Sequence, residues 1–250
     1  MREINEDSYL VAPNLFVVAD GMGGHAAGEV ASAIAVGEFR ALAEESELRA
    51  EAIAEAIARA NQQILQSGTQ HETRTGMGTT LAGLGVVRAG GSAHWAVFNV
   101  GDSRVYHYVH GELHQVSVDH SEVQDLITAG YITADEAKTH PDRNVVTRSL
   151  GTDPAPVPDM WVFPPVAGER FLICSDGLPR ELEDDEIQTI LHAETIAQQA
   201  ATALVARAVE AGGHDNITVV VIDFAGSMTD GLAHEIDEDT APRTTGLVGF

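Results

Sequence analysis

Four segments rich in β-branched and aromatic residues follow one another between residues 79 and 118, and their spacing constrains the fold more than any other feature of the chain. They cover residues 79–87, 94–100, 104–109 and 113–118 and are joined by short, mostly glycine-containing connections. Such connections cannot hold the crossover that parallel neighbours require, so we expect antiparallel pairing. The stretch Val109-His110-Gly111-Glu112 is typical of a hairpin turn.

Helices and further strands are expected on both sides of this antiparallel block. Ile53, Ile57, Ala60 and Ile64 recur at helical spacing and form one apolar face. Strands are expected at 15–20, 160–163, 170–176 and 217–224, and helices at 28–45, around 53–64, at 184–191 and at 196–211, with short helical segments at 122–129 and 134–138. This order lacks the regular alternation of a doubly wound sheet. It predicts an α+β fold, a four-layer αββα sandwich of two mostly antiparallel sheets flanked by helix pairs.

The composition changes after residue 225. Residues 227–250 contain five carboxylates, scattered Gly and Thr, and no periodic apolar face. Such a segment buries too little apolar surface to offset the entropy cost of ordering it. We therefore predict a folded domain over residues 1–225 and a flexible acidic C-terminal tail over residues 226–250.

The chain is strongly acidic. Its 14 Lys and Arg against 38 Asp and Glu give a formal charge of −24. Nucleic acid and anionic membranes attract basic surfaces, so neither is expected as a partner. An anionic substrate would need a local source of positive charge, which bound divalent cations supply.

The single cysteine, Cys174, excludes an internal disulfide framework and a Cys-rich zinc module. It lies in an apolar segment, where a buried and inert thiol is expected. No apolar run approaches the length of a membrane span, and the first residues are too polar for a signal peptide. These observations predict a cytoplasmic protein.

Three aspartates occupy similar positions at the ends of expected strands. Asp20 and Asp176 are each followed by Gly, and Asp215 stands just before the strand that begins at Ile217. One Asp-Gly pair alone indicates only a turn. If the three carboxylates meet, their mutual repulsion raises their pKa values unless cations lie between them. An all-oxygen site of this kind suits Mg²⁺ or Mn²⁺.

Seven short motifs extend this pattern along the chain. They are Arg2-x-x-Asn5-Glu6-Asp7, Val18-Ala19-Asp20-Gly21-Met22-Gly23-Gly24-His25, Gly76-Met77-Gly78-Thr79-Thr80, Asn99-Val100-Gly101-Asp102-Ser103-Arg104, Asp119-His120-Ser121, Cys174-Ser175-Asp176-Gly177 and Gly213-His214-Asp215-Asn216-Ile217-Thr218. In this order they resemble the bacterial branch of the PPM (type 2C) metal-dependent Ser/Thr protein phosphatases. Residues of about 120–148 are similar to the flap segment of that branch.

The resemblance implies a set of metal ligands. Asp20 would bridge two Mn²⁺ or Mg²⁺ ions, and the carbonyl of Gly21 would add a further ligand. Asp176 and Asp215 would complete the protein ligands of the first ion. Glu6 would face the second ion, directly or through water.

The resemblance also implies roles around the two ions. Asp7 would hold a reactive water by hydrogen bonding, and Arg2 would bind the phosphate. Asp119 together with Asp176 would hold a third, weaker ion, whereas Asp102 would play a supporting role. Eukaryotic members of the family carry a His at the position of Met22, and this His is thought to protonate the leaving group. Met22 has no proton to donate, so the choice of acid stays open between a metal-bound water and His25.

The implied activity is hydrolysis of phosphoserine and phosphothreonine. A hydroxide formed from water between the ions would attack phosphorus in line. The implied partners are phosphorylated proteins, including Ser/Thr kinases and their substrates, and a monomer is expected. Two alternatives use the same fold: a phosphatase of an anti-sigma-antagonist phosphoprotein in a stress switch, and a non-catalytic pseudophosphatase that binds phosphoproteins. A two-metal nuclease is disfavoured by the negative charge.

Overall fold

The computed structural model describes residues 5–23, 27–45 and 47–226. The predictions made for Arg2, His25 and the tail after residue 226 lie outside this part of the chain. Within the described residues, none of the helices combines the length and the apolar character that crossing a bilayer requires.

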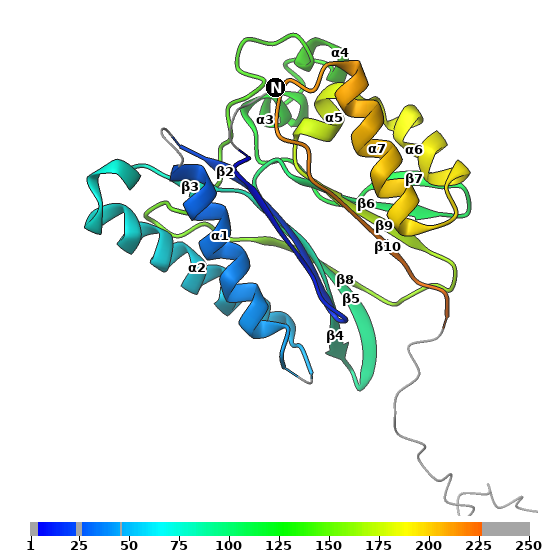
Figure 1. Ribbon diagram of the computed structural model, residues 1–250, viewed down its shortest axis with the longest axis horizontal. Coiled ribbons are helices and arrows are strands. Elements are labelled where there is room, and N and C mark those ends of the chain that lie inside the picture. Colours follow the sequence, from blue (N-terminus) through cyan, green and yellow to red (C-terminus); the bar gives the residue numbers. More distant parts are fainter. Residues whose placement is uncertain (1–4, 24–26, 46, 227–250) are drawn as a thin grey trace, which may run out of the picture.

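Two antiparallel sheets form the centre of the molecule (Figure 1). The first sheet has the order β1 (Asp7–Val11), β2 (Leu15–Met22), β4 (Leu81–Ala89), β5 (Ser92–Val100) and β8 (Asp159–Phe163), and the short β3 (Gly78–Thr79) pairs with β2. The second sheet has the order β10 (Val219–Asp223), β9 (Arg170–Cys174), β6 (Arg104–Val109) and β7 (Glu112–Gln115). Every strand pair in both sheets is antiparallel, which confirms the pairing predicted from the short connections.

Helices cover the outer faces of both sheets (Figure 1). The helices α1 (Ala27–Leu42) and α2 (Ala50–Gln70) lie on the first sheet, and α6 (Asp184–Ala193) and α7 (Ala197–Ala211) lie on the second. The shorter elements are η1 (Glu72–Arg74), α3 (Glu122–Thr128), α4 (Ala134–Ala137) and α5 (Gly177–Glu181). The predicted four-layer αββα sandwich is therefore confirmed.

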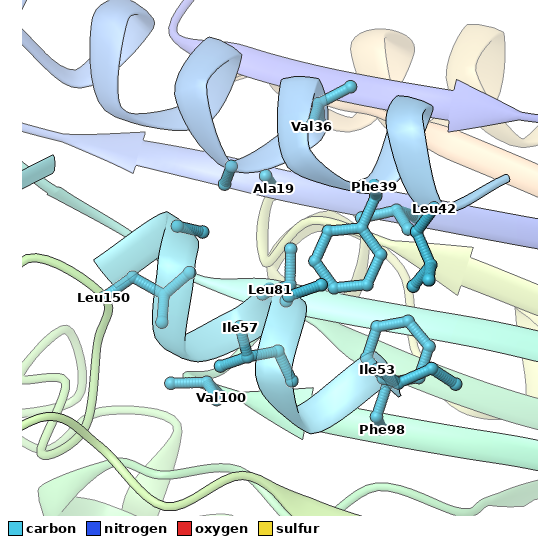
Figure 2. Close-up of a cluster of buried hydrophobic side chains, with 14 of the residues drawn as sticks. Ala19, Val36, Phe39, Leu42, Ile53, Ile57, Leu81, Phe98, Val100 and Leu150 are labelled. Atoms are coloured by element: carbon cyan, nitrogen blue, oxygen red, sulfur yellow. The ribbon is translucent and has the colours of Figure 1, made fainter. Parts of the chain in front are cut away.

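Three hydrophobic clusters separate the four layers. The first fills the space between the helix pair α1 and α2 and the first sheet (Figure 2), where the rings of Phe39 and Phe98 stack with centroids 5.3 Å apart. The predicted apolar face of α2, including Ile53 and Ile57, points into this cluster. The second cluster lies between the two sheets, and the third lies between the second sheet and its helices. Burial of this apolar surface is the main force that holds the layers together.

The local differences from the sequence prediction have local causes. The predicted hairpin turn is present, with both His110 (φ 53°) and Gly111 (φ 86°) in the left-handed region that a two-residue turn requires. The strand predicted to reach residue 118 ends at Gln115, because the amides of Val116 and Ser117 both donate to the carbonyl of Val105 and so interrupt the ladder. The polar strand β1 and the five-residue helix α5 were not predicted, since neither carries a clear apolar period.

Candidate metal centre

The carboxylates singled out in the sequence lie at one end of the two sheets. Register places Asp7 opposite Asp20 in the first sheet. Cys174, two residues before Asp176, lies opposite Val219, so β9 ends where the Asp215 loop enters β10. The sequence predicted that Asp20 ends a strand, and this prediction is wrong. Asp20 lies within β2, which continues to Met22 and changes partner to β3.

A pocket of about 280 Å³ opens at this end of the sandwich. Its walls carry most of the predicted metal ligands, together with a residue pair from the flap segment and one basic side chain. The lining residues are Glu6, Asp20, Gly21, Met22, Gly23, Thr80, Asp102, Asn144, Val146, Asp176, Arg180 and Asp215. Five of the six predicted metal residues, Glu6, Asp20, Gly21, Asp176 and Asp215, therefore meet in one place.

Close backbone contacts position the half of the site that comes from the first sheet. A Cβ atom on Gly21 would lie 2.2 Å from the carbonyl oxygen of Gly28 and 2.5 Å from that of Glu6, so only glycine fits between them. The amide of Gly21 donates to the Glu6 carbonyl at 3.2 Å. The amide of Asp20 donates to Oγ1 of Thr80 at 3.0 Å. These contacts hold Glu6 and Asp20 at fixed positions on the pocket wall.

The half that comes from the second sheet is fastened by the loop before β10. Gly177 packs so tightly against this loop that a Cβ atom would lie 2.0 Å from the carbonyl oxygen of Asn216. The side-chain Oδ1 of Asn216 accepts from the backbone amide of Glu6 at 3.0 Å, and the backbone amide of Asn216 donates to Oδ1 of Asp215 at 2.8 Å. Asn216 thus joins the loop that carries Asp215 to the start of β1.

Asp7 connects the two sheets directly. Its Oδ2 accepts hydrogen bonds from the hydroxyls of Ser175 at 2.8 Å and Thr218 at 2.7 Å. Its Oδ1 is buried and has no hydrogen-bond partner among the described residues. Burial raises the pKa of Asp7 above its ordinary value, although the two hydroxyls oppose this shift.

The carboxylates repel one another, as the sequence predicted for a convergent cluster. Burial, and then the charges of Asp176 and Asp7, hold the pKa of Asp20 well above its usual range. The pKa of Asp176 is raised by burial and by Asp215, against the opposing effect of Arg180. Burial and the charge of Asp176 raise the pKa of Asp102 to about 7. A cluster with these shifts is short of positive charge.

Arg180 is the one functional candidate in the pocket that sequence reasoning missed. Its Nη1 lies 2.9 Å from Oδ2 of Asp215, and its Nη2 contacts Oδ2 of Asp176. In the described part of the chain, no three His, Cys, Asp or Glu side chains stand ready-made around one point to hold a metal ion. A signal was present in the sequence, because Arg180 lies one helical turn after Asp176, but α5 itself had not been predicted.

The donor set nevertheless fits a pair of hard divalent cations. All predicted ligands are oxygens, which Mg²⁺ and Mn²⁺ prefer. Besides Oδ1 of Asp7, Oδ1 of Asp176 is buried without a hydrogen-bond partner among the described residues. Buried carboxylate oxygens without donors are costly, and a cation would satisfy them.

Asp119 departs from its expected place. It does not line the pocket, and Nε and Nη2 of Arg104 donate to its two oxygens at distances between 2.7 and 3.0 Å. Gln115 donates to the same carboxylate at 2.8 Å. The ligand role of Asp119 stays a prediction from the sequence motif, and in this structure its carboxylate pairs with Arg104. Asp102 lines the pocket instead.

The flap segment reaches the pocket through Asn144 and Val146. Its two ends are tied together, since the amide of Thr147 donates to the carbonyl of His120 at 2.8 Å. The ring of His120 accepts from the amide of Gly101 through Nδ1 at 3.0 Å and meets Asp159 on β8 through Nε2 at 3.1 Å. The base of the segment is therefore fastened to the first sheet beside Asp102.

Comparison with known proteins agrees with this geometry. A family model described as protein phosphatase 2C matches residues 3–211. The serine/threonine protein phosphatase PstP of Mycobacterium tuberculosis is 37% identical over 226 residues, which cover 89% of this chain but only 43% of PstP. The serine/threonine phosphatase stp of Listeria welshimeri is 36% identical over 239 residues, which cover 89% of this chain and 91% of that relative.

Solved structures show the same fold. The crystal structure of M. tuberculosis PstP superposes with a TM-score of 0.83 at 36% identity, covering 90% of this chain and 94% of the other. A crystal structure of the PstP catalytic domain in complex with two manganese ions gives a TM-score of 0.79 at 35% identity, covering 90% and 94%.

Proposed function

We propose, since this chain belongs to the protein phosphatase 2C family, that it is a metal-dependent protein serine/threonine phosphatase. The observation that carries the proposal is the convergence of Glu6, Asp20, Asp176 and Asp215 on one pocket. The orphaned oxygens and raised carboxylate pKa values of this cluster favour a site for divalent cations.

The family resemblance assigns the ligands of the two ions, and the convergence of these residues on one pocket supports the assignment. Asp20 would contact both ions and the Gly21 carbonyl would assist it. Asp176 and Asp215 would hold the first ion, and Glu6 would face the second. When bound, a pair of Mn²⁺ or Mg²⁺ ions supplies positive charge for a phosphate and lowers the pKa of a bound water toward neutrality.

Other side chains prepare the reaction. Ser175 and Thr218 fix Oδ2 of Asp7, which leaves Oδ1 to accept a hydrogen bond from the attacking water. Asp119 together with Asp176 is proposed for a third and weaker ion, as the motif implies, and Asp102, which lines the pocket, would support the site. Arg2 as the phosphate-binding residue remains a prediction from the sequence motif.

Phosphorylated proteins are the proposed substrates, with Ser/Thr kinases and the proteins they modify as the finer assignment. We infer a catalytic domain over residues 1–225 with a flap over about 120–148, an acidic tail over 226–250, and a monomer in the cytoplasm. The charge of −24 supports the absence of nucleic acid and anionic membrane among the partners.

Turnover of a phosphothreonine peptide at increasing Mn²⁺ tests this proposal. We expect the wild-type chain to need the metal, and Asp176→Asn to lose at least about 100-fold, since even groups behind the ligands are worth 10–100-fold. Asp185→Asn, a surface change of the same charge, should retain wild-type turnover. Equal activity in excess EDTA would refute the metal-dependent mechanism.

One observation favours the pseudophosphatase as a second candidate. Arg180 already contacts two of the proposed ligands, and a chain that never released them would bind phosphoproteins without cleaving them. The same Mn²⁺ titration separates the two, because a pseudophosphatase would show neither metal binding nor turnover. The alternative of an anti-sigma-antagonist substrate is separated by a panel of phosphoproteins.

A further inference from the structure

Arg180 lies between two carboxylates that the proposed function assigns to the same ion. It extends from α5, four residues after Asp176, and lines the pocket. Its guanidinium reaches Oδ2 of Asp176 through Nη2 and Oδ2 of Asp215 through Nη1, the latter at 2.9 Å. Each carboxylate side chain is only 14% exposed, so these contacts are poorly screened by solvent.

The charge balance makes this contact important. Five carboxylates line the pocket, from Glu6, Asp20, Asp102, Asp176 and Asp215, and among its described lining residues the only basic side chain is that of Arg180. The guanidinium therefore provides positive charge that the acidic cluster needs. A planar fork with several donors suits two neighbouring carboxylates better than a point charge does.

The loop that carries Asp215 is also held by contacts that do not involve Arg180. The neighbouring Glu181 accepts hydrogen bonds from the backbone amide of His214 at 2.9 Å and from its ring Nδ1 at 2.8 Å. Gly177 packs against Asn216 on the other side of Asp215. Helix α5 thus holds the loop through Glu181 and Gly177, while Arg180 acts on the charge of the two carboxylates.

We propose that Arg180 is a built-in competitor of the divalent ion at the Asp176–Asp215 pair. The inference rests on the proposed function, because it takes these two residues as ligands. A guanidinium and a cation held by the same two carboxylates repel each other, and a cation that uses their Oδ2 atoms must displace Arg180 from them. Arg180 thereby sets the metal affinity of the site below the value that the carboxylates alone would give.

Calorimetric titration with Mn²⁺ alone tests this competition. Arg180→Met removes the charge but keeps an unbranched side chain. We expect this variant to bind Mn²⁺ about 10-fold more tightly than the wild type, because the ion no longer has to replace the charge-assisted hydrogen bonds of Arg180. Arg180→Lys should fall between the two, since an ammonium cannot span both carboxylates as a fork does. Arg207→Met removes the same charge from the exposed pair with Glu186 and should leave the affinity unchanged.

Thermal unfolding gives a readout independent of turnover. In EDTA, Arg180→Met should melt below the wild type because Asp176 and Asp215 lose their counter-charge, and added Mn²⁺ should raise its Tm more than that of the wild type. If both proteins bind Mn²⁺ and Arg180→Met binds it no more tightly than the wild type, the inference is overturned and the proposed function stands. Binding by Arg180→Met alone would support the inference and reject the phosphatase, and binding by neither would reject both.

Discussion

A carboxylate lies next to each end of strand β9, Glu169 before it and Asp176 after it, and the two have opposite surroundings. Before the strand, Glu169 is fully partnered: its Oε1 accepts from the indole of Trp95 at 2.5 Å and from the amide of Val166 at 2.8 Å, and its Oε2 meets His107 at 2.7 Å. After the strand, Asp176 pairs with Arg180 and faces the carboxylate of Asp20, and its Oδ1 has no hydrogen-bond partner in the described residues.

The difference separates a structural carboxylate from a functional one. Donors surround Glu169, and the adjacent Arg170 is likewise satisfied by Asp223 and three backbone carbonyls. Carboxylates surround Asp176, and their repulsion raises its pKa. A buried acid with donors stabilises the fold, whereas a buried acid among acids is costly until a cation arrives.

The largest effect is expected at the structural end. Glu169→Ala leaves buried donors of Trp95 and Val166 without an acceptor, so we expect a loss of about 3–5 kcal/mol in the free energy of unfolding, measured by urea denaturation in EDTA. Glu186→Ala breaks an exposed pair with Arg207 and should cost less than about 1 kcal/mol. Similar losses of stability in both variants would show that the hydrogen bonds of Glu169 stabilise the fold no more than an exposed ion pair does.

The free energy of unfolding is expected to depend on pH because of the carboxylate cluster around Asp176, where repulsion and burial favour the protonated acids. Because the pKa of Asp102 is raised to about 7, the folded chain keeps this proton while the unfolded chain loses it near pH 4. Stability in EDTA should therefore fall as the pH rises from about 4 to 7. Asp102→Asn should remove about 2–3 kcal/mol of this fall between pH 5 and 7.5, and an unchanged slope would show that Asp102 does not titrate in this window.

A smaller gain is expected when Asp20 is neutralised. Asp20→Asn removes one repelling charge, and in EDTA we expect about 1 kcal/mol of added stability, as is common when a strained functional site is relaxed. The same change should abolish the rise in Tm on adding Mn²⁺, measured by calorimetry. A destabilised Asp20→Asn protein whose Tm still rises with Mn²⁺ would show that the carboxylates around Asp176 neither repel one another nor need Asp20 to bind the ion.

Alkylating reagents are expected to have no effect on Cys174, which lies between the two ends of β9. Cys174 lies inside β9, fully buried, and burial raises the pKa of its thiol to about 12. The thiolate that alkylating agents attack is therefore scarce and shielded at pH 8. Mass spectrometry should show no reaction of the folded chain with iodoacetamide, full reaction in denaturant, and unchanged turnover. Rapid labelling of the folded chain would show that β9 opens.

Much of the fold could be predicted from local sequence. Short connections required antiparallel strands, the period of α2 placed Ile53 and Ile57 in the core, and the His110-Gly111 pair marked the hairpin turn. Strand β1 and helix α5 escaped prediction because they are short and lack an apolar period. Tertiary contacts hold them in place, such as the two hydroxyls that bind Asp7 and the loop that packs on Gly177.

The sequence by itself determined which chemistry the chain can carry: oxygen ligands in ordered motifs, a single thiol inside an apolar strand, and a charge of −24 that needs cations beside an anion. Only the tertiary structure decided which carboxylates share the pocket. It brought in Asp102, left Asp119 with Arg104, and set Arg180 against Asp176 and Asp215. The physical reason is that residue type is local, whereas charge interactions depend on distances between segments far apart in the chain.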